Sequence, residues 1–328
     1  MEALGTFVAE AFAGIPACEV DRYFVFPPAD ELGVRDRIIY VRSNAFNPND
    51  SEDTQRSTNV GASIGDGSTP LLATTIDEIT EAQLQGGAIL SLMPGTHTLS
   101  KALKTTSPLM IYSPCAGSAT IRLEGTATIE VASASHVVIG GVHIHAQDVT
   151  GAMVKLDSVD QSVVMNTHFS ATGSSEARGI HAIGTGDERL DIRRSIFTGM
   201  GMGIDLEKVH GRVEKTHIHD VAQTGVRVGS EEAQTASTFH AFLVVADSAV
   251  SGGSTPLSRN RQGIWAQAAF VGLHNVHISH FLVNDATETV GIGIRAEESF
   301  VVARGQSQIS RHDGPGIEAT SSRVWLTD

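Results

Sequence analysis

The chain has 328 residues, of which 41% are apolar and 5% aromatic, and its formal net charge is −14. That length allows one long domain or two ordinary ones, with enough apolar residues for a sizeable core. A surface this acidic should repel nucleic acid and anionic membranes, and no apolar run reaches the roughly 18 residues that a membrane-spanning helix needs. We therefore expect neither nucleic acid nor a membrane as a partner.

Residues 1–67 contain no repeat and are predicted to form an N-terminal arm and linker. Within them, Arg37–Arg42 has the apolar content of a strand, and 44–67 is rich in Asn, Asp, Ser, Thr and Gly, as linkers are. One face of a predicted amphipathic helix gathers apolar side chains that we expect to hold the arm against a partner chain. These are Leu4, Phe7, Val8 and Phe12. The alternative is an arm that folds back on its own chain.

The start of the chain lacks the basic region of a secretory signal peptide. The two cysteines, Cys18 and Cys115, lie far apart in the sequence and can pair only if the fold brings them together. Two free buried thiols are the alternative, so the sequence leaves the redox compartment open.

A short apolar motif, usually opened by glycine, recurs through the rest of the chain. Its central positions are 25, 26, 24, 22, 38, 30 and 23 residues apart. They are Ile129, Val154, Ile180, Ile204, Val226, Ile264, Ile294 and Ile317. A second column, between polar neighbours, contains Ile144, Phe169, Phe197, Ile218, Val250, Ile278 and Ile309. A further alternating run, such as Val137–Ile139, lies between the columns, so each period holds three strand-like pieces.

Three alternating strands can close into a coil whose apolar side chains point to a common axis. One coil cannot bury that face alone, so coils must stack, with equivalent residues about 4.8 Å apart. The glycine before each apolar pair fits either a positive φ or a close backbone approach. The step of 38 residues predicts loops inserted at 229–241 and 252–262.

The segment Gly86–Leu99 reads Gly-Gly-Ala-Ile-Leu-Ser-Leu-Met-Pro-Gly-Thr-His-Thr-Leu. With the repeat, it resembles the opening of the right-handed parallel β-helix, or pectin lyase-like, superfamily. The resemblance covers 86–328 and implies an all-β solenoid over 68–328, with a capping helix near 75–85 and coils from about 86. It is a weak guide to function, because this fold serves lyases, hydrolases, epimerases, adhesins and phage tailspikes. The catalytic motifs of the polygalacturonases and alginate epimerases, and the acidic calcium cluster of the pectate lyases, are missing from the sequence.

The residues that follow the first-column positions should face solvent, and several neighbours among them alternate in charge. They are Glu130, Lys155, His181, Asp205, Arg227, Trp265, Arg295 and Glu318. Opposite charges on adjacent strands stabilise a sheet by about 0.2–1 kcal/mol per pair, so we interpret the series as a structural charge ladder. The functional alternative is a saccharide-binding strip in which Trp265 stacks on a sugar ring.

Histidines accompany the second column, and metal binding by them is the sharper alternative to a solvated sheet face. They are His143, His168, His217 and His277. Zinc needs three or four converging ligands, whereas a flat sheet splays its side chains apart. We therefore expect no metal and no cofactor.

An enzyme of this fold would need a base and a cation close together. The best set in the sequence is Asp205, His217 and Arg227, which would suit a lyase or epimerase acting on a uronate polymer. A glycoside hydrolase would instead pair Asp205 with Asp220 or Glu207. Charged residues are common on any solvated face, so these sets weigh less than the structural interpretation.

The leading hypothesis is therefore a structural or adhesive component of a viral (phage) particle, such as a head decoration protein, tailspike or fibre module. The coils carry no recognisable catalytic set, the N-terminus resembles an anchoring arm, and 324–328 offers no obvious cap for the last strand edge, which partners usually cover. The expected partners are further copies in a homotrimer and other virion proteins, with polysaccharide as an additional candidate. The expected location is the virion, or outside the cell for an adhesin.

Overall fold

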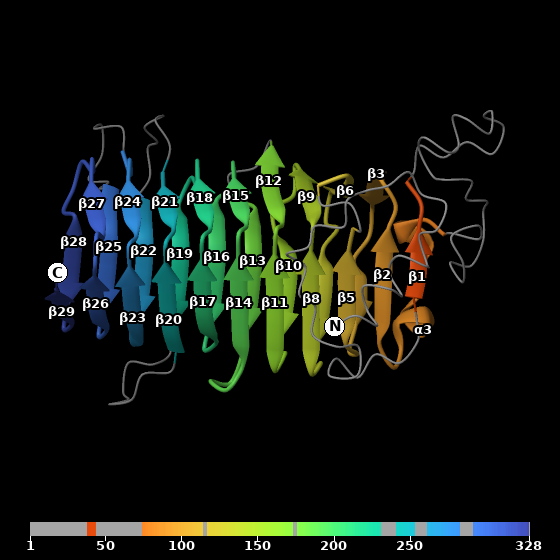
Figure 1. Ribbon diagram of the computed structural model, residues 1–328, viewed down its shortest axis with the longest axis horizontal. Helices are drawn as coiled ribbons and strands as arrows, with labels where there is room; N and C mark the ends of the chain where they lie inside the picture. The colour runs from red at the N-terminus through yellow and green to blue at the C-terminus, as the bar shows by residue number, and fades with distance from the viewer. Residues whose placement is uncertain are drawn as a thin grey trace.

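The computed structural model describes residues 38–43, 74–113, 117–172, 176–230, 241–252, 261–282 and 291–327. Within these ranges, 29 strands form three parallel sheets that wind into a rod (Figure 1). The fold is a right-handed parallel β-helix, which confirms the predicted all-β class. We call the sheets A, B and C; the chain visits them in that order and then returns to sheet A one rung further along the axis.

The spatial order of the strands in each sheet follows the order of the chain. Sheet A contains β1 (Ile38–Val41), β2 (Ala88–Leu92), β5 (Leu109–Tyr112), β8 (His136–Gly140), β11 (Gln161–Met165), β14 (Arg189–Arg193), β17 (His210–Glu214), β20 (Ala241–Ala246), β23 (Ala269–His274), β26 (Phe300–Arg304) and β29 (Arg323–Leu326). Sheet B contains β3 (Gly95–Leu99), β6 (Ala119–Glu124), β9 (Val142–Gln147), β12 (His168–Thr172), β15 (Ile196–Thr198), β18 (His217–His219), β21 (Ala249–Ser251), β24 (His277–Ser279) and β27 (Gln308–Ser310). Sheet C contains β4 (Leu103–Thr105), β7 (Ile129–Ala132), β10 (Ala152–Asp157), β13 (Arg178–Ile183), β16 (Met202–Glu207), β19 (Thr224–Gly229), β22 (Arg261–Gln267), β25 (Gly291–Glu297) and β28 (Ile317–Thr320).

The first strand of sheet A comes from the segment that the sequence assigned to the arm. Strand β1 pairs in parallel with β2, with Ile39 opposite Leu90. Ile39 and Val41 are buried and extend the inward column of sheet A by one rung. The strand predicted at Arg37–Arg42 is therefore confirmed, and it belongs to the β-helix and not to the 1–67 arm.

The helix predicted near 75–85 is two short pieces, the 3-10 helix η2 (Ile76–Glu78) and the α-helix α3 (Glu81–Leu84). The two residues between them, Ile79 and Thr80, are extended, and Thr80 caps the start of the second piece with a capping box. A threonine N-cap favours a new helix start over continuation of the first helix. Ile76 and Leu84 are buried in the core that the first coil also shares.

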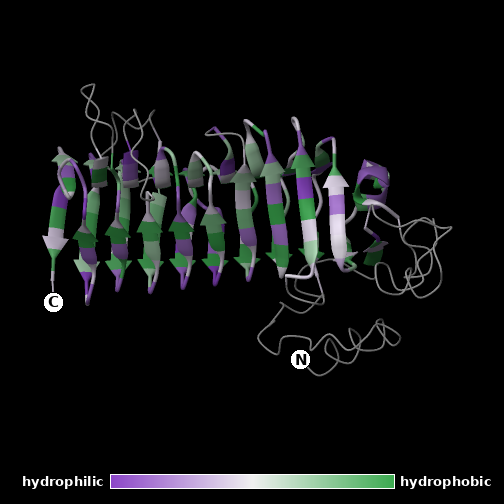
Figure 2. Ribbon diagram, turned by 90° about the horizontal axis from the view of Figure 1, so that it is seen from above, coloured by the Kyte–Doolittle hydropathy of each residue, from purple (hydrophilic) through white to green (hydrophobic). Residues whose placement is uncertain are grey.

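The inward columns follow the sequence repeat. In sheet C, each Ile or Val of the first column lies opposite the next, from Ile129 to Ile317. In sheet B the second column does the same, and the rings of Phe169 and Phe197 stack with centroids 4.6 Å apart. Figure 2 shows the resulting alternation of hydrophobic and hydrophilic bands along the strands. Both predicted columns are confirmed.

The glycines that open the sheet C motif allow a close backbone approach. They are Gly179, Gly203, Gly225, Gly263 and Gly293, and none of the five has a positive φ. A Cβ on Gly203 would lie 2.6 Å from the carbonyl oxygen of Gly225 and 2.8 Å from Cγ2 of Ile218. The corresponding distance to the next carbonyl oxygen is 2.5 or 2.6 Å at every glycine of the column. Of the two interpretations that the sequence left open, close approach is the correct one.

Positive φ occurs instead directly after many strands of all three sheets, mostly at residues other than glycine, such as Ser158 (φ 53°) and Lys215 (φ 50°). The turns after sheet A also contain a buried hydroxyl ladder, which consists of Thr167, Ser195, Thr216 and Ser248. The hydroxyl of Thr216 donates to the carbonyl of Glu214 at 3.0 Å and accepts from the N–H of Ser195 at 3.4 Å. These bonds satisfy backbone N–H and C=O groups at the turn, where the hydrogen bonds between strands end.

Several expectations fall outside the described residues. They include the arm helix with Leu4, Phe7, Val8 and Phe12, the linker 44–67, and both Cys18 and Cys115. Most of each predicted inserted loop also lies outside them, although β19 ends at Gly229 and β20 begins at Ala241, as the loop at 229–241 requires.

We expect Gly203→Ala to lower the free energy of unfolding by about 1–3 kcal/mol, because its methyl group would collide with the carbonyl of Gly225 and separate the rungs. Gly151→Ala is the matched control, since a Cβ at Gly151 meets nothing within 4 Å. Urea unfolding followed by circular dichroism would compare the midpoints. Equal midpoints for the two variants would contradict the close-approach role.

Candidate functional site

A buried carboxylate lies on the outer side of sheet C. Asp205 projects from β16 away from the core, yet its side chain is fully buried. Arg227, on the next strand, donates through Nε to Oδ1 at 2.6 Å and through Nη2 to Oδ2 at 3.0 Å. Arg178 donates through Nη1 to Oδ2 at 2.9 Å. Two guanidinium groups therefore compensate one carboxylate that water does not reach.

His181 lies opposite Asp205 on β13 and completes this cluster. Its Nε2 is 3.7 Å from Oδ2 of Asp205 and 3.9 Å from Oε2 of Glu207. Burial lowers the pKa of His181 and outweighs the opposing effect of the Asp205 charge. The imidazole is therefore expected to be neutral near pH 7, where it fills space beside the ion pairs.

The neighbouring rungs confirm the predicted charge ladder. Glu130 accepts from Lys104 at 2.9 Å and from Lys155 at 3.1 Å, and these two bonds lower the pKa of Glu130. Arg295 lies 3.9 Å from Glu318 on the next strand. Lys104 on β4 was missing from the predicted series, and it extends the ladder by one rung. The sequence signal was present, because Leu103-Lys104 occupies the same register as Ile129-Glu130.

Trp265 lies in this ladder between two arginines. The guanidinium carbons of Arg227 and Arg295 are 6.0 and 5.7 Å from the centroid of its ring. They come from strands β19 and β25, which flank β22 on opposite sides. The indole Nε1 also donates to Glu297 at 3.3 Å. A sugar ring stacking on Trp265 would have to displace an arginine, so the position favours cation–π contacts within the ladder.

The structure does not bring the three candidate catalytic residues together. Asp205 and Arg227 are in contact on sheet C, whereas His217 is an exposed residue on β18 of sheet B. Asp220 follows β18 and pairs with His219 at 2.9 Å, so it also belongs to the sheet B side of the coil. The linear spacing correctly placed these residues on neighbouring rungs but did not reveal that they face in different directions.

Sheet B carries a cluster of imidazoles on its outer face. His143 and His168 stack with ring centroids 4.5 Å apart and an angle of 11° between the planes. The Oγ of Ser170 lies 2.7 Å from Nε2 of His143 and 2.8 Å from Nδ1 of His145. Burial, together with the neighbouring His168 and His145, lowers the pKa of His143 to about 4. In the part of the chain that the structure describes, no group of three or more His, Cys, Asp or Glu side chains is arranged to hold a metal ion.

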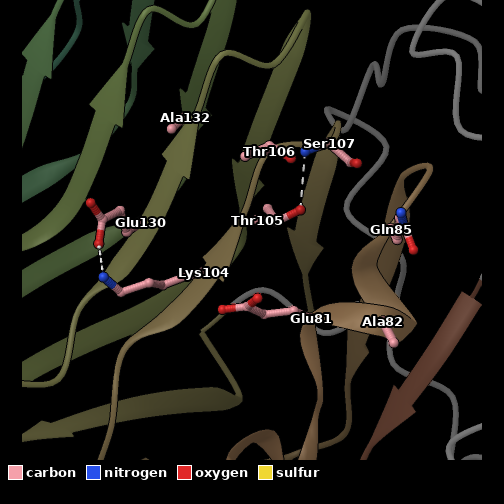
Figure 3. Close-up of a pocket in the computed structure, with 9 residues that line it drawn as sticks. All are labelled: Glu81, Ala82, Gln85, Lys104, Thr105, Thr106, Ser107, Glu130 and Ala132. Atoms are coloured by element: carbon pink, nitrogen blue, oxygen red, sulfur yellow. Dashed lines mark hydrogen bonds and ion pairs between the residues drawn. The ribbon is translucent and has the colours of Figure 1, made fainter.

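A shallow hollow of about 510 Å³ lies where α3 meets the first rungs of sheet C (Figure 3). Its lining residues are Glu81, Ala82, Gln85, Lys104, Thr105, Thr106, Ser107, Glu130 and Ala132. On one side of the hollow, Lys104 extends toward Glu130 and pairs with it. Because these opposite charges compensate each other, we interpret the hollow as the junction between the capping helix and the first coils and not as a charged binding site.

The outer face of sheet A becomes apolar toward its last strands. Four aromatic rings follow one another on β20, β23, β26 and β29, with successive centroids 5.8, 5.4 and 5.1 Å apart. Val244 and Val302 lie beside these rings on β20 and β26. We call the six residues the sheet A strip: Phe242, Phe270, Phe300, Trp325, Val244 and Val302. Phe242, Val244 and Trp325 are 45%, 43% and 58% exposed, far above the values of core side chains.

This strip was not predicted from the sequence, although its signal was an apolar residue at outward positions of an alternating strand. In β20, Phe242 and Val244 occupy the positions that hold the polar residues His210 and Arg212 in β17. An outward phenylalanine recurs at the matched positions Phe242, Phe270 and Phe300.

Comparison of the chain with family models, with curated proteins and with solved structures found no match in any of the three. The strand arrangement shows the β-helix fold, and membership of the pectin lyase-like superfamily remains a resemblance of sequence pattern. Among the described residues, no helix is long and apolar enough to cross a membrane.

Asp205→Asn should lower the free energy of unfolding by about 3–5 kcal/mol, because Arg178 and Arg227 would lose the buried charge that compensates them. The control is Asp191→Asn, which removes a partner of Arg193 at the surface and should cost at most about 1 kcal/mol. Thermal unfolding of both variants would measure the difference. An unchanged midpoint for Asp205→Asn would rule out a structural role for the cluster.

Stability should fall as the pH drops from about 6.5 toward 4. The pKa of His143 is lowered from its ordinary 6.5 to about 4, so between these values the unfolded chain binds a proton that the folded chain does not. The lowered pKa of His168 acts in the same direction. The double variant His143→Gln/His168→Gln should therefore show a smaller loss of melting temperature between pH 7.5 and pH 5 than the unchanged chain. His277→Gln, at an exposed site on the same sheet, serves as the control, and an equal loss in all three proteins would disprove the prediction.

Proposed function

We propose that the chain is a structural or adhesive component of a viral (phage) particle, such as a head decoration protein, a tailspike or a fibre module. The observation that carries the proposal is the sheet A strip and its surroundings. Of the five large apolar side chains exposed in the described ranges, three lie on the outer face of sheet A. They are Phe242, Val244 and Trp325, whereas Leu326 continues the inward column of Ala303. Contiguous exposed apolar groups on a folded surface mark contact sites for other molecules.

The remaining faces support a structural role. On sheet C the outward charges pair with one another along the rod, from Lys104 to Glu318. On sheet B the imidazoles stack and share a hydroxyl group. These contacts hold long faces of the rod in a fixed arrangement, and such faces suit repeated contacts with partners. The proposed partners are further copies in a homotrimer, engaged through the arm residues Leu4, Phe7, Val8 and Phe12, and other virion proteins.

The test is the native mass of the purified chain, measured by light scattering over a range of concentrations, for the full chain and for a variant lacking residues 1–37. The deletion stops at 37 because β1 begins at Ile38 and belongs to the β-helix. We expect the full chain to form a trimer or larger assembly of its 34.6 kDa unit and the shortened chain to be monomeric. A monomer in both cases would contradict the proposal. New ultraviolet absorbance on addition of uronate polymers would then point to the lyase alternative.

A further inference from the structure

The charges around the sheet A strip indicate what kind of partner it fits. Outward positions on the last six strands of sheet A hold five arginines and two carboxylates, although the chain as a whole has a net charge of −14. The arginines are Arg189, Arg193, Arg212, Arg304 and Arg323, and the carboxylates are Asp191 and Glu214. This face is therefore locally basic on an acidic protein.

The excess positive charge lies next to the strip. The two carboxylates are already paired with Arg193 and Arg212. The other three arginines are exposed, and none of them has a carboxylate partner within the described ranges. Two of these border the strip, because Arg323 lies opposite Phe300 in the strand register and Arg304 ends the strand that contains Phe300. A partner must therefore offer apolar groups for the centre of the strip and negative charge for its border.

Three other occupants fit this surface less well. The rings of the strip already pack with centroids 5.4 and 5.8 Å apart, so no nucleic acid base could insert between them. Two strips placed face to face would bring like charges together. A polyanion without apolar groups would engage the arginines but leave Phe242, Val244 and Trp325 in water.

Residues 1–37 of the chain have the required chemistry in their sequence. They contain seven Asp and Glu residues against three Arg, and they include Leu4, Phe7, Val8 and Phe12. We propose that this segment of one copy docks on the sheet A strip of a neighbouring copy. The inference rests on the proposed function, and it names the surface and the partner through which the copies assemble.

The arrangement is compatible with the reach of the segment. Strand β1 is seven strand steps from β20 in the order of sheet A, which is about 34 Å at about 4.8 Å per step. A chain of 37 residues spans at most about 120 Å when extended, so the segment can reach a neighbouring rod. When the copy that receives the segment is not the copy that gives one in return, the contact is heterologous, and it closes into a ring such as a trimer when the rotation allows.

A charge-swap experiment in the full chain tests the docking. The strip variant is Arg304→Glu/Arg323→Glu, the segment variant is Glu2→Arg/Glu10→Arg, and the third protein combines all four substitutions. Sedimentation velocity over a range of concentrations would give the dissociation constant of each. We expect each double variant to associate about tenfold or more weakly than the unchanged chain, and the combined variant to regain most of the loss. Lys101→Glu/Arg311→Glu, which reverses two exposed charges outside sheet A, should associate like the unchanged chain.

Each other outcome overturns the inference in a distinguishable way. If the unchanged chain assembles and the strip variant assembles equally well, the docking surface is wrong while the proposed function stands. If the segment variant weakens assembly but the combined variant does not recover, the segment contacts a different surface. If the unchanged chain is monomeric at every concentration, the segment does not join two copies, and the proposed function fails with the inference.

Discussion

In-register parallel stacking is the constraint on which the rest of this structure depends. Each residue lies about 4.8 Å from the residue at the same position of the next coil, so every position in the coil becomes a column. A column accepts only side chains that tolerate their own neighbours at that distance. This explains why the glycine at Gly203 faces the carbonyl of Gly225, and why Thr216 donates within its turn while it accepts from the turn before.

The same constraint decides how charge is distributed outside the core. Columns of like charge would repel at the spacing of a single strand, so the outer face of sheet C alternates in sign from Lys104 to Glu130 to Lys155. Where one carboxylate, Asp205, has arginines from two different strands around it, the side chains cover it completely. A buried ion cluster can thus arise on the outer face of a sheet, because the long side chains on adjacent rungs extend over the shorter one.

Each of the three sheets carries a different kind of side-chain contact on its outer face, although residues of all three alternate along the sequence. Sheet C compensates its own charges, sheet B stacks its imidazoles, and sheet A exposes aromatic rings bordered by arginines. A coil of about three strands gives each sheet a different direction, so residues on neighbouring rungs cooperate only when they share a sheet. Asp205 and Arg227 share one, and His217 does not. For this reason the proposed function rests on the extended outer surfaces of the rod.

The sequence by itself determined the fold class, the two apolar columns and the order of the charge ladder, because all three depend on periodicity along the chain. It also predicted the strand at Arg37–Arg42. Only the tertiary structure decided that this strand belongs to the β-helix, that the glycines of sheet C serve close approach, and that Trp265 lies between two arginines. It alone showed that Phe242, Phe270, Phe300 and Trp325 form one strip and that His217 faces away from Asp205. The physical reason is that periodicity specifies which residues recur, whereas the direction in which each sheet faces, and the reach of long side chains between rungs, are set only when the coils close and stack.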